Sequence, residues 1–97
     1  MPEFSNSFSG NNSKKFLDEG ELIRAIRFSI AAEYEAIQLY EQLACSINNK
    51  MVKEVLLDIA NEEQEHAGEF MKILEILSPE EIKNYDAGKS EVEEKFM

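Results

Sequence analysis

Cysteine, proline and glycine are scarce in this chain. Cys45 is the single cysteine, and there are four glycines and two prolines in 97 residues. One cysteine excludes an internal disulfide and favours a reducing compartment. A composition dominated by aliphatic and charged residues with few helix breakers favours helices. The sequence therefore predicts one small all-α domain without covalent cross-links.

Positive charge is also in short supply. Lys and Arg number 10 against 20 Asp and Glu, which gives a formal net charge of −10. Such a surface repels the phosphates of nucleic acids and favours cations as ligands. No apolar run approaches the length of a membrane span, and the first residues do not resemble a signal peptide. We therefore expect a cytoplasmic protein with no nucleic-acid partner and no membrane partner.

Hydrophobic periodicity divides the chain into a tail and two long helices. Residues 1–17 are rich in Ser, Asn and Gly and predict a flexible N-terminal tail. Asp18 and Glu21 match a capping box, and apolar residues then recur at helical spacing as far as Ile47. A second periodic segment, residues 50–77, follows an Asn-containing turn. A connection this short predicts an antiparallel helical hairpin.

A short third helix is expected after the hairpin. The stretch SPEEIKNY at residues 78–85 begins with a cap residue, then a proline suited to the first helical position, then an acid three residues after the cap. The triplet Asp-Ala-Gly that follows predicts its end. We therefore expect one helical domain over residues 18–85 and a C-terminal segment, residues 86–97, that is partly helical or frayed.

Three polar side chains interrupt the apolar stripes of the two long helices. Glu33 lies on the stripe of the first helix, and Glu63 and His66 lie on that of the second. Burying a lone carboxylate is strongly unfavourable unless a positive charge or a donor compensates it. No Lys or Arg occupies the same stripes. The missing positive charge predicts a bound cation.

The spacing of these three residues predicts that they meet. Glu63 and His66 are three residues apart, so they are neighbours on one helical face. With the turn near Asn48, Glu33 lies fifteen residues before it and Glu63 fifteen residues after it. Antiparallel packing places both at one axial level. Glu33, Glu63 and His66 are therefore expected to converge between the helices.

This set is half of the ligand set of a di-iron carboxylate bundle. In such four-helix bundles two helices each give a Glu, and the other two each give a Glu-x-x-His. Two copies of this chain related by a two-fold axis would complete both the bundle and the site. Carboxylates with imidazole suit iron, while Mn, Zn or Ca are able to substitute or to bind peripherally. The alternative is a set of structural side chains satisfied by hydrogen bonds alone.

Two segments around these residues resemble the encapsulated ferritins, relatives of the ferritins and rubrerythrins. They are AAEYEAIQLYEQLA at residues 31–44 and IANEEQEHAGEFMKIL at residues 59–74. The resemblance covers about residues 21–85 and implies a two-helix ferritin-like protein held inside an encapsulin shell. It implies that Glu33, Glu63 and His66 are ferroxidase ligands, with two irons bound across each dimer interface.

The resemblance also implies roles for other residues and a mode of assembly. Tyr40 matches a tyrosine close to the iron centre, and Glu35 matches one member of an acidic pair on the iron entry route. The other member of that pair is replaced by Ala32. The family commonly forms a decameric ring of five dimers. The chain ends SEVEEKFM, which does not match the docking peptide of cargo relatives.

A further acidic line lies on the outer face of the second helix. Its members follow one another at steps of four and three, and an ordinary solvated face is the simpler interpretation. A peripheral metal site is the alternative. The residues are Asp58, Glu62 and Glu65.

Three functions are consistent with the sequence. The first is a ferroxidase that feeds iron storage inside an encapsulin shell, with catalytic roles for Glu33, Glu63, His66 and Tyr40. The second is a rubrerythrin-like di-iron peroxidase or oxidoreductase, against which the absence of a Cys-x-x-Cys motif weighs. The third is a non-enzymatic helical scaffold or iron-binding module.

Overall fold

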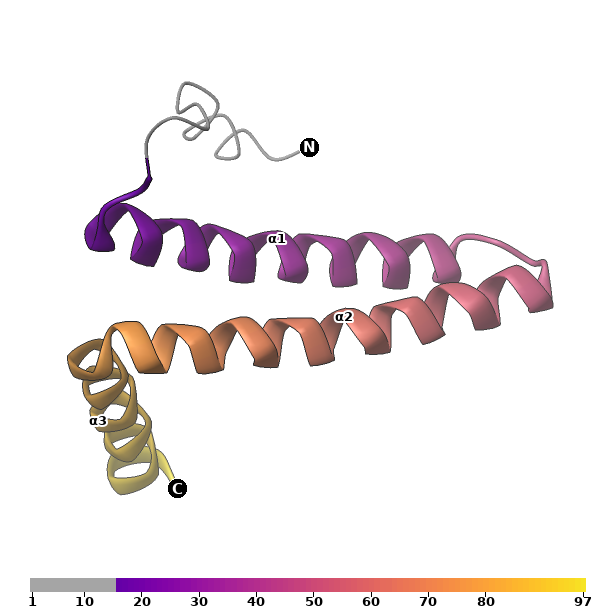
Figure 1. Cartoon of the computed structure of the whole chain (residues 1–97). Helices are drawn as coiled ribbons and strands as arrows, with labels where there is room; N and C mark the ends of the chain where they lie inside the picture. Colours follow the sequence, from indigo (N-terminus) through magenta and orange to yellow (C-terminus); the bar gives the residue numbers. More distant parts are fainter. Residues whose placement is uncertain (1–15) are drawn as a thin grey trace.

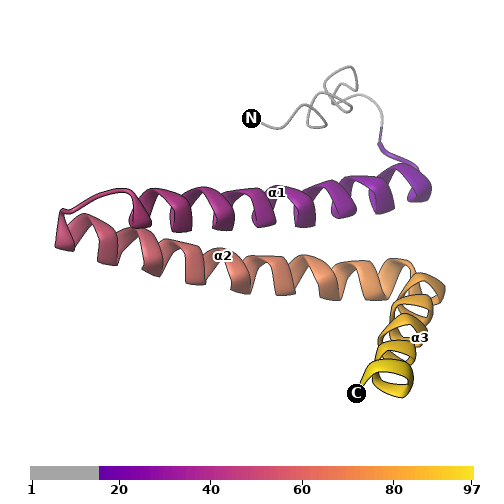
Figure 2. The same cartoon turned by 180° about the vertical axis from the view of Figure 1, so that it is seen from behind.

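The structure, a computed structural model, describes residues 16–97 and contains three α-helices in that range. They are α1 (Glu19–Cys45), α2 (Lys50–Leu77) and α3 (Pro79–Phe96). α1 and α2 lie side by side as an antiparallel hairpin, and α3 turns sharply away from the end of α2 (Figure 1). Figure 2 shows the same arrangement from behind. The predicted tail, residues 1–17, falls almost wholly outside the described residues. Within residues 16–97, none of the helices is long and apolar enough to cross a membrane.

Capping residues explain where the hairpin helices begin. The Asp18 carboxylate accepts a hydrogen bond from the Glu21 N–H at 2.8 Å, and the Glu21 carboxylate accepts one from the Asp18 N–H at 2.9 Å. The predicted capping box is therefore present. Asn49 starts α2 by accepting a hydrogen bond from the Val52 N–H at 3.1 Å.

Small side chains hold α1 and α2 together. Within residues 16–97 the buried apolar residues are Ala44, Ala60, Ala67 and Leu74. The last three recur every seven residues, so they form one row along α2. Larger apolar side chains elsewhere on α2 stay partly in solvent: Val55 is 49% exposed. A lone hairpin therefore lacks the covered core of a complete domain.

α3 is longer than the sequence predicts. The helix expected to end near Tyr85 continues to Phe96. Gly88, at the expected stop, has no positive φ and so does not form a left-handed helix cap. The predicted end near Tyr85 is therefore wrong, and the segment expected to be partly helical or frayed, residues 86–97, is helical as far as Phe96. Ion pairs at three-residue spacing lie along the exposed surface of α3, namely Lys83–Glu80 at 3.2 Å and Lys89–Asp86 at 3.9 Å.

Candidate metal centre

The three predicted ligands lie together between α1 and α2. One ligand atom from each of Glu33, Glu63 and His66 lies within 4.8 Å of the other two. α1 contributes Glu33, and α2 contributes the other two. Within residues 16–97 this is the one group of three or more His, Cys, Asp or Glu side chains close enough to hold a metal. We call it the ligand cluster.

Seven-residue rows on α2 explain how Glu63 and His66 differ in exposure. Residues at this spacing share nearly the same helical face. Glu63 belongs to a row of residues seven apart that lies close to α1, and its side chain is 21% exposed. His66 belongs to another such row, which lies at the open edge of the hairpin, and its side chain is 50% exposed. His66 is thus less buried in one chain than a core position would be. The first row contains Leu56, Glu63, Phe70 and Leu77, and the second contains Val52, Ile59, His66 and Ile73.

Glu63 and His66 interact directly. Nδ1 of His66 lies 3.1 Å from Oε1 of Glu63. This hydrogen bond raises the pKa of His66 above its ordinary value, and the negative charges of Glu63, Glu33 and Glu69 act in the same direction. Because a metal binds the neutral imidazole, a cation entering the cluster has to displace any proton that His66 holds.

Glu33 has a buried oxygen without a partner. No hydrogen bond reaches its Oε2 atom, which is closed off from solvent. The pKa of Glu33 is raised, first by a hydrogen bond shared with Glu63, then by burial and by the negative charge of Glu63. Two carboxylates this close compete for one proton unless a cation lies near both. The unpartnered oxygen and the closeness of the two carboxylates therefore fit a cation bound by Glu33 and Glu63.

The chemistry of the donors fits a transition metal. Carboxylate oxygens combined with an imidazole nitrogen suit iron, manganese and zinc. A cation here would bind the unpartnered Oε2 atom and remove the repulsion between the two carboxylates. Glu33, Glu63 and His66 therefore fit such an ion.

The other predicted site residues stay apart from the ligand cluster. Tyr40 lies seven residues, or about 10 Å along the helix axis, from Glu33. No hydrogen bond joins Tyr40 to the cluster in the described part of the chain, and Glu35 is exposed. The acidic line forms no group of three metal ligands within residues 16–97, so its role stays a prediction; its members Asp58, Glu62 and Glu65 are all exposed.

Sequence reasoning missed a second charged cluster, at the base of α3. Arg27 of α1 pairs with Glu81 of α3, with 2.6 Å between Nη2 and Oε1. Hydrogen bonds from Arg27 and Tyr85 hold the pKa of the Glu81 carboxyl down at about 2. The two partners are 54 residues apart, and nothing in their local sequence indicates the pairing.

The chain is similar to several known proteins. A family model described as Rubrerythrin matches residues 25–97. A ferritin-like-encapsulin shell fusion protein of Pyrococcus furiosus is 43% identical over 84 residues, which cover 87% of this chain and 24% of that protein. The encapsulin nanocompartment cargo protein EncC of Myxococcus xanthus is 37% identical over 81 residues, 84% of this chain and 61% of that protein. The chain therefore spans about a quarter of the first relative and about three-fifths of the second.

A solved structure shares the fold. The crystal structure of the encapsulated ferritin domain from Pyrococcus furiosus aligns with a TM-score of 0.84 at 40% identity. The alignment covers 91% of this chain and 90% of that one. The predicted all-α, ferritin-like fold is thereby confirmed.

Proposed function

The chain belongs to the rubrerythrin family of ferritin-like domains, and from this we propose that it is a ferroxidase. It oxidises Fe(II) to Fe(III) at a di-iron site that two copies of the chain form together. The observation that carries the proposal is the ligand cluster, in which Glu33 has a buried oxygen atom without a partner. This unmet oxygen supports a metal site over a cluster satisfied by hydrogen bonds alone.

A second copy of the chain is needed because one ligand cluster is half a site. Two copies related by a two-fold axis would bring together four carboxylates and two imidazoles. The row of α2 that carries His66 lies open in one chain, with Val52 38% exposed and Ile73 39% exposed. Packing of a second hairpin on this row would cover those side chains and bury the metal ligands. The same contact would thus complete the core and the site.

The residues of the chain favour the oxidised product. Bound as a pair, two Fe(II) ions supply two electrons, which with two protons reduce one dioxygen to hydrogen peroxide. Glu33 and Glu63 place negative charge around the site, and this charge stabilises Fe(III) more than Fe(II). His66 serves as a neutral ligand and gives up its proton when iron binds. Mn, Zn and Ca are the ions expected to compete.

Other residues keep supporting roles in the proposal. Tyr40 lies near the centre in the assembled dimer, where its hydroxyl donates a hydrogen bond to a ligand or to the bound oxidant. Glu35 lies on the route by which iron enters. The acidic line on the outer face of α2 binds further cations before or after oxidation; it consists of Asp58, Glu62 and Glu65.

We propose that the product is stored in an encapsulin shell in the cytoplasm. The relatives that support this are named as a shell fusion protein and as a cargo protein. A ring of five dimers, the assembly we expect, encloses little volume for mineral. Storage therefore needs a larger compartment, and the shell protein is the expected partner.

The name of the matching family favours one other function, a rubrerythrin-like di-iron oxidoreductase. Such an enzyme would use the same ligands with hydrogen peroxide as the preferred oxidant. Comparing the initial rates with dioxygen and with peroxide separates the two functions. A scaffold without a metal would show neither rate and no bound iron.

The test follows ferric absorbance after air is admitted to anaerobic protein mixed with Fe(II). Glu33→Ala and His66→Ala are expected to lose most of the oxidation rate. Glu41→Ala and Glu54→Ala, which remove exposed carboxylates from the same two helices, are matched controls expected to keep it. Equal rates in all of these proteins would overturn the proposal. A second readout is the size of the assembly, which is expected to increase when Fe(II) is added.

A further inference from the structure

The Glu81 carboxylate is a meeting point of three parts of the chain. Arg27 of α1 donates to it through Nε at 3.0 Å and through Nη2 at 2.6 Å. Ser78, at the corner between α2 and α3, donates through Oγ at 3.0 Å. Tyr85, one turn further along α3, donates its hydroxyl hydrogen to Oε2. We call these four residues the α3 joint.

Little else fixes the direction of α3. A single non-helical residue, Ser78, with φ −139° and ψ 66°, separates α2 from α3. No backbone position of α3 lies within 8 Å of α1 in the described chain. None of the residues of α3 is buried. α3 therefore extends from the hairpin through a single non-helical residue, Ser78, which acts as a hinge.

An open groove separates α3 from the hairpin. A groove of about 870 Å³ lies between the hairpin and α3, lined among others by Tyr34, Met71, Ile82 and Lys89. The Tyr34 side chain, on the floor of this groove, is 50% exposed. A Cβ atom added to Gly68, which also lines the groove, would meet nothing within 4 Å. The open groove shows that α3 is not packed tightly against the hairpin along its length.

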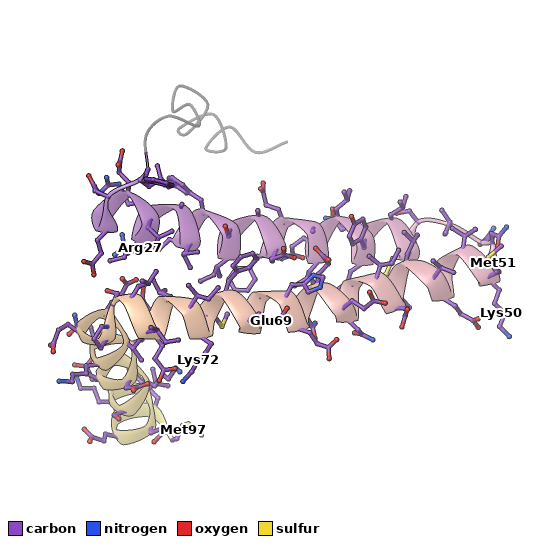
Figure 3. The ribbon with its side chains drawn as sticks, viewed as in Figure 1. Arg27, Lys50, Met51, Glu69, Lys72 and Met97 are labelled. Carbon is purple, nitrogen blue, oxygen red and sulfur yellow. The ribbon has the colours of Figure 1, made fainter. Side chains whose placement is uncertain are left out.

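We propose that Glu81 latches α3 at a fixed angle to the hairpin, and that Arg27, Ser78 and Tyr85 are positioning residues that act through it. The two-pronged contact of a guanidinium with a carboxylate fixes orientation as well as distance. Figure 3 shows Arg27 close to the corner from which α3 leaves, and Met97 at the far end of α3. The latch depends on the fold and not on the proposed metal chemistry.

The angle of α3 determines where its apolar residues are presented. Val92 is 51% exposed and Phe96 79%, and both lie on the outer half of the helix. An 18-residue helix is about 27 Å long, so a rotation of about 10° at Ser78 would displace its end by about 5 Å. Closed symmetric assemblies need the same rotation between every pair of neighbouring copies. A latched α3 meets that requirement, whereas a free α3 would present these residues at variable positions.

The test measures the distance between α1 and α3 with two spin labels. In the full chain carrying Cys45→Ser, labels are attached through Gln38→Cys on α1 and Ser90→Cys on α3, both exposed positions. Dilution with unlabelled chain restricts the signal to distances within one copy. The labelled background is expected to give one narrow distance distribution.

Loss of the latch should broaden this distribution. Glu81→Gln and Arg27→Gln are expected to abolish the single narrow peak. The matched controls are Glu80→Gln, next to Glu81 on an exposed face, and Arg24→Gln, one turn before Arg27. Both controls should retain the narrow peak.

Milder variants guard against a simple failure to fold. Tyr85→Phe removes one donor, and Arg27→Lys keeps the charge but loses the two-pronged contact. Each is expected to broaden the distribution less than Glu81→Gln, while circular dichroism shows unchanged helix content. Narrow distributions in all four joint variants, or equal broadening in the Glu80→Gln control, would overturn the latch.

Discussion

The ligand cluster and the α3 joint each contain a carboxylate in a crowded place, and the chain treats the two in opposite ways. At the α3 joint, a guanidinium and two hydroxyls surround Glu81 and lower its pKa to about 2. In the ligand cluster, Glu33 has a buried oxygen without a partner, and its pKa is raised by Glu63 and by burial. Among residues 16–97, the chain provides a cation in one cluster and none in the other.

This difference separates a permanent contact from an exchangeable one. A cation that belongs to the chain, such as Arg27, stays in place and fixes the geometry of a helix. A cluster that lacks its cation is unfavourable until something from solution supplies the charge. The ligand cluster therefore suits an ion that has to enter and leave, as a ferroxidase substrate does.

The largest expected effect is on iron binding. Glu63→Ala should weaken Fe(II) binding by more than about tenfold, since loss of even an outer partner of a metal ligand costs about 10- to 100-fold. Glu81→Ala should weaken it less, because Glu81 lies outside the ligand cluster. Anaerobic calorimetric titration with Fe(II) measures both, with Glu80→Ala as the control. Equal losses in the Glu63 and Glu81 variants would remove the distinction between the clusters.

The next largest effect is on the stability of the metal-free protein, which substitutions of Glu33 and Glu81 should change in opposite directions. Glu33→Gln removes a poorly compensated charge and should stabilise the fold by on the order of 1 kcal/mol. Glu81→Gln should destabilise it, because the replaced charge was well compensated. Thermal unfolding at pH 7 in chelator, at one fixed protein concentration, measures both changes. A lower midpoint for Glu33→Gln would contradict the interpretation of its unpartnered oxygen.

The two carboxylates should also respond differently to acid. The folded pKa of Glu81 is about 2 against an ordinary value of 4.5, so its stabilisation is present above about pH 4.5 and is lost as the pH falls toward 2. The difference in the free energy of unfolding between wild type and Glu81→Gln should therefore fall toward zero as the pH is lowered from about 4.5 to about 2. For Glu33, whose pKa is raised, the difference between wild type and Glu33→Gln should close at a higher pH. Urea unfolding across pH tests this order, and the reverse order would refute it.

The smallest effect concerns the helical state of the C-terminal segment. A Cβ atom at Gly88 would meet nothing within 4 Å, so Gly88→Ala should stabilise α3 by about 0.5–1 kcal/mol through helix propensity alone. Ala87→Gly, in the same turn, is the matched change of opposite sign. Hydrogen exchange of the α3 amides measures both. No change in either variant would mean that residues 86–97 are frayed in solution, as the sequence suggested.

The ligand cluster could be predicted because its geometry follows from regular helices. Helical periodicity places Glu63 and His66 on the apolar stripe of the second helix, and the short turn places Glu33 at the same axial level. Capping residues such as Asp18 fixed the register of the hairpin. Each of these inferences needs only helical periodicity and one short connection.

The α3 joint could not be predicted in this way. Its pairing of Arg27 with Glu81 depends on the angle of α3, and local sequence does not indicate the angle at which the chain turns at Ser78. The sequence also predicts too early an end for α3, because Asp86, Ala87 and Gly88 resemble a helix stop, whereas Gly88 adopts ordinary helical geometry. Exposed helices offer no apolar stripe by which their ends could be recognised.

The small number of buried apolar side chains in the hairpin has a consequence for newly synthesised chains. With Ala44, Ala60 and Ala67 making up most of what is buried, a single copy gains little from closing on itself. In the proposed dimer, folding and pairing would merge into one bimolecular event, whose half-time shortens as the chain concentration rises. Until a copy meets its neighbour, its uncovered aliphatic side chains invite proteolysis and aggregation.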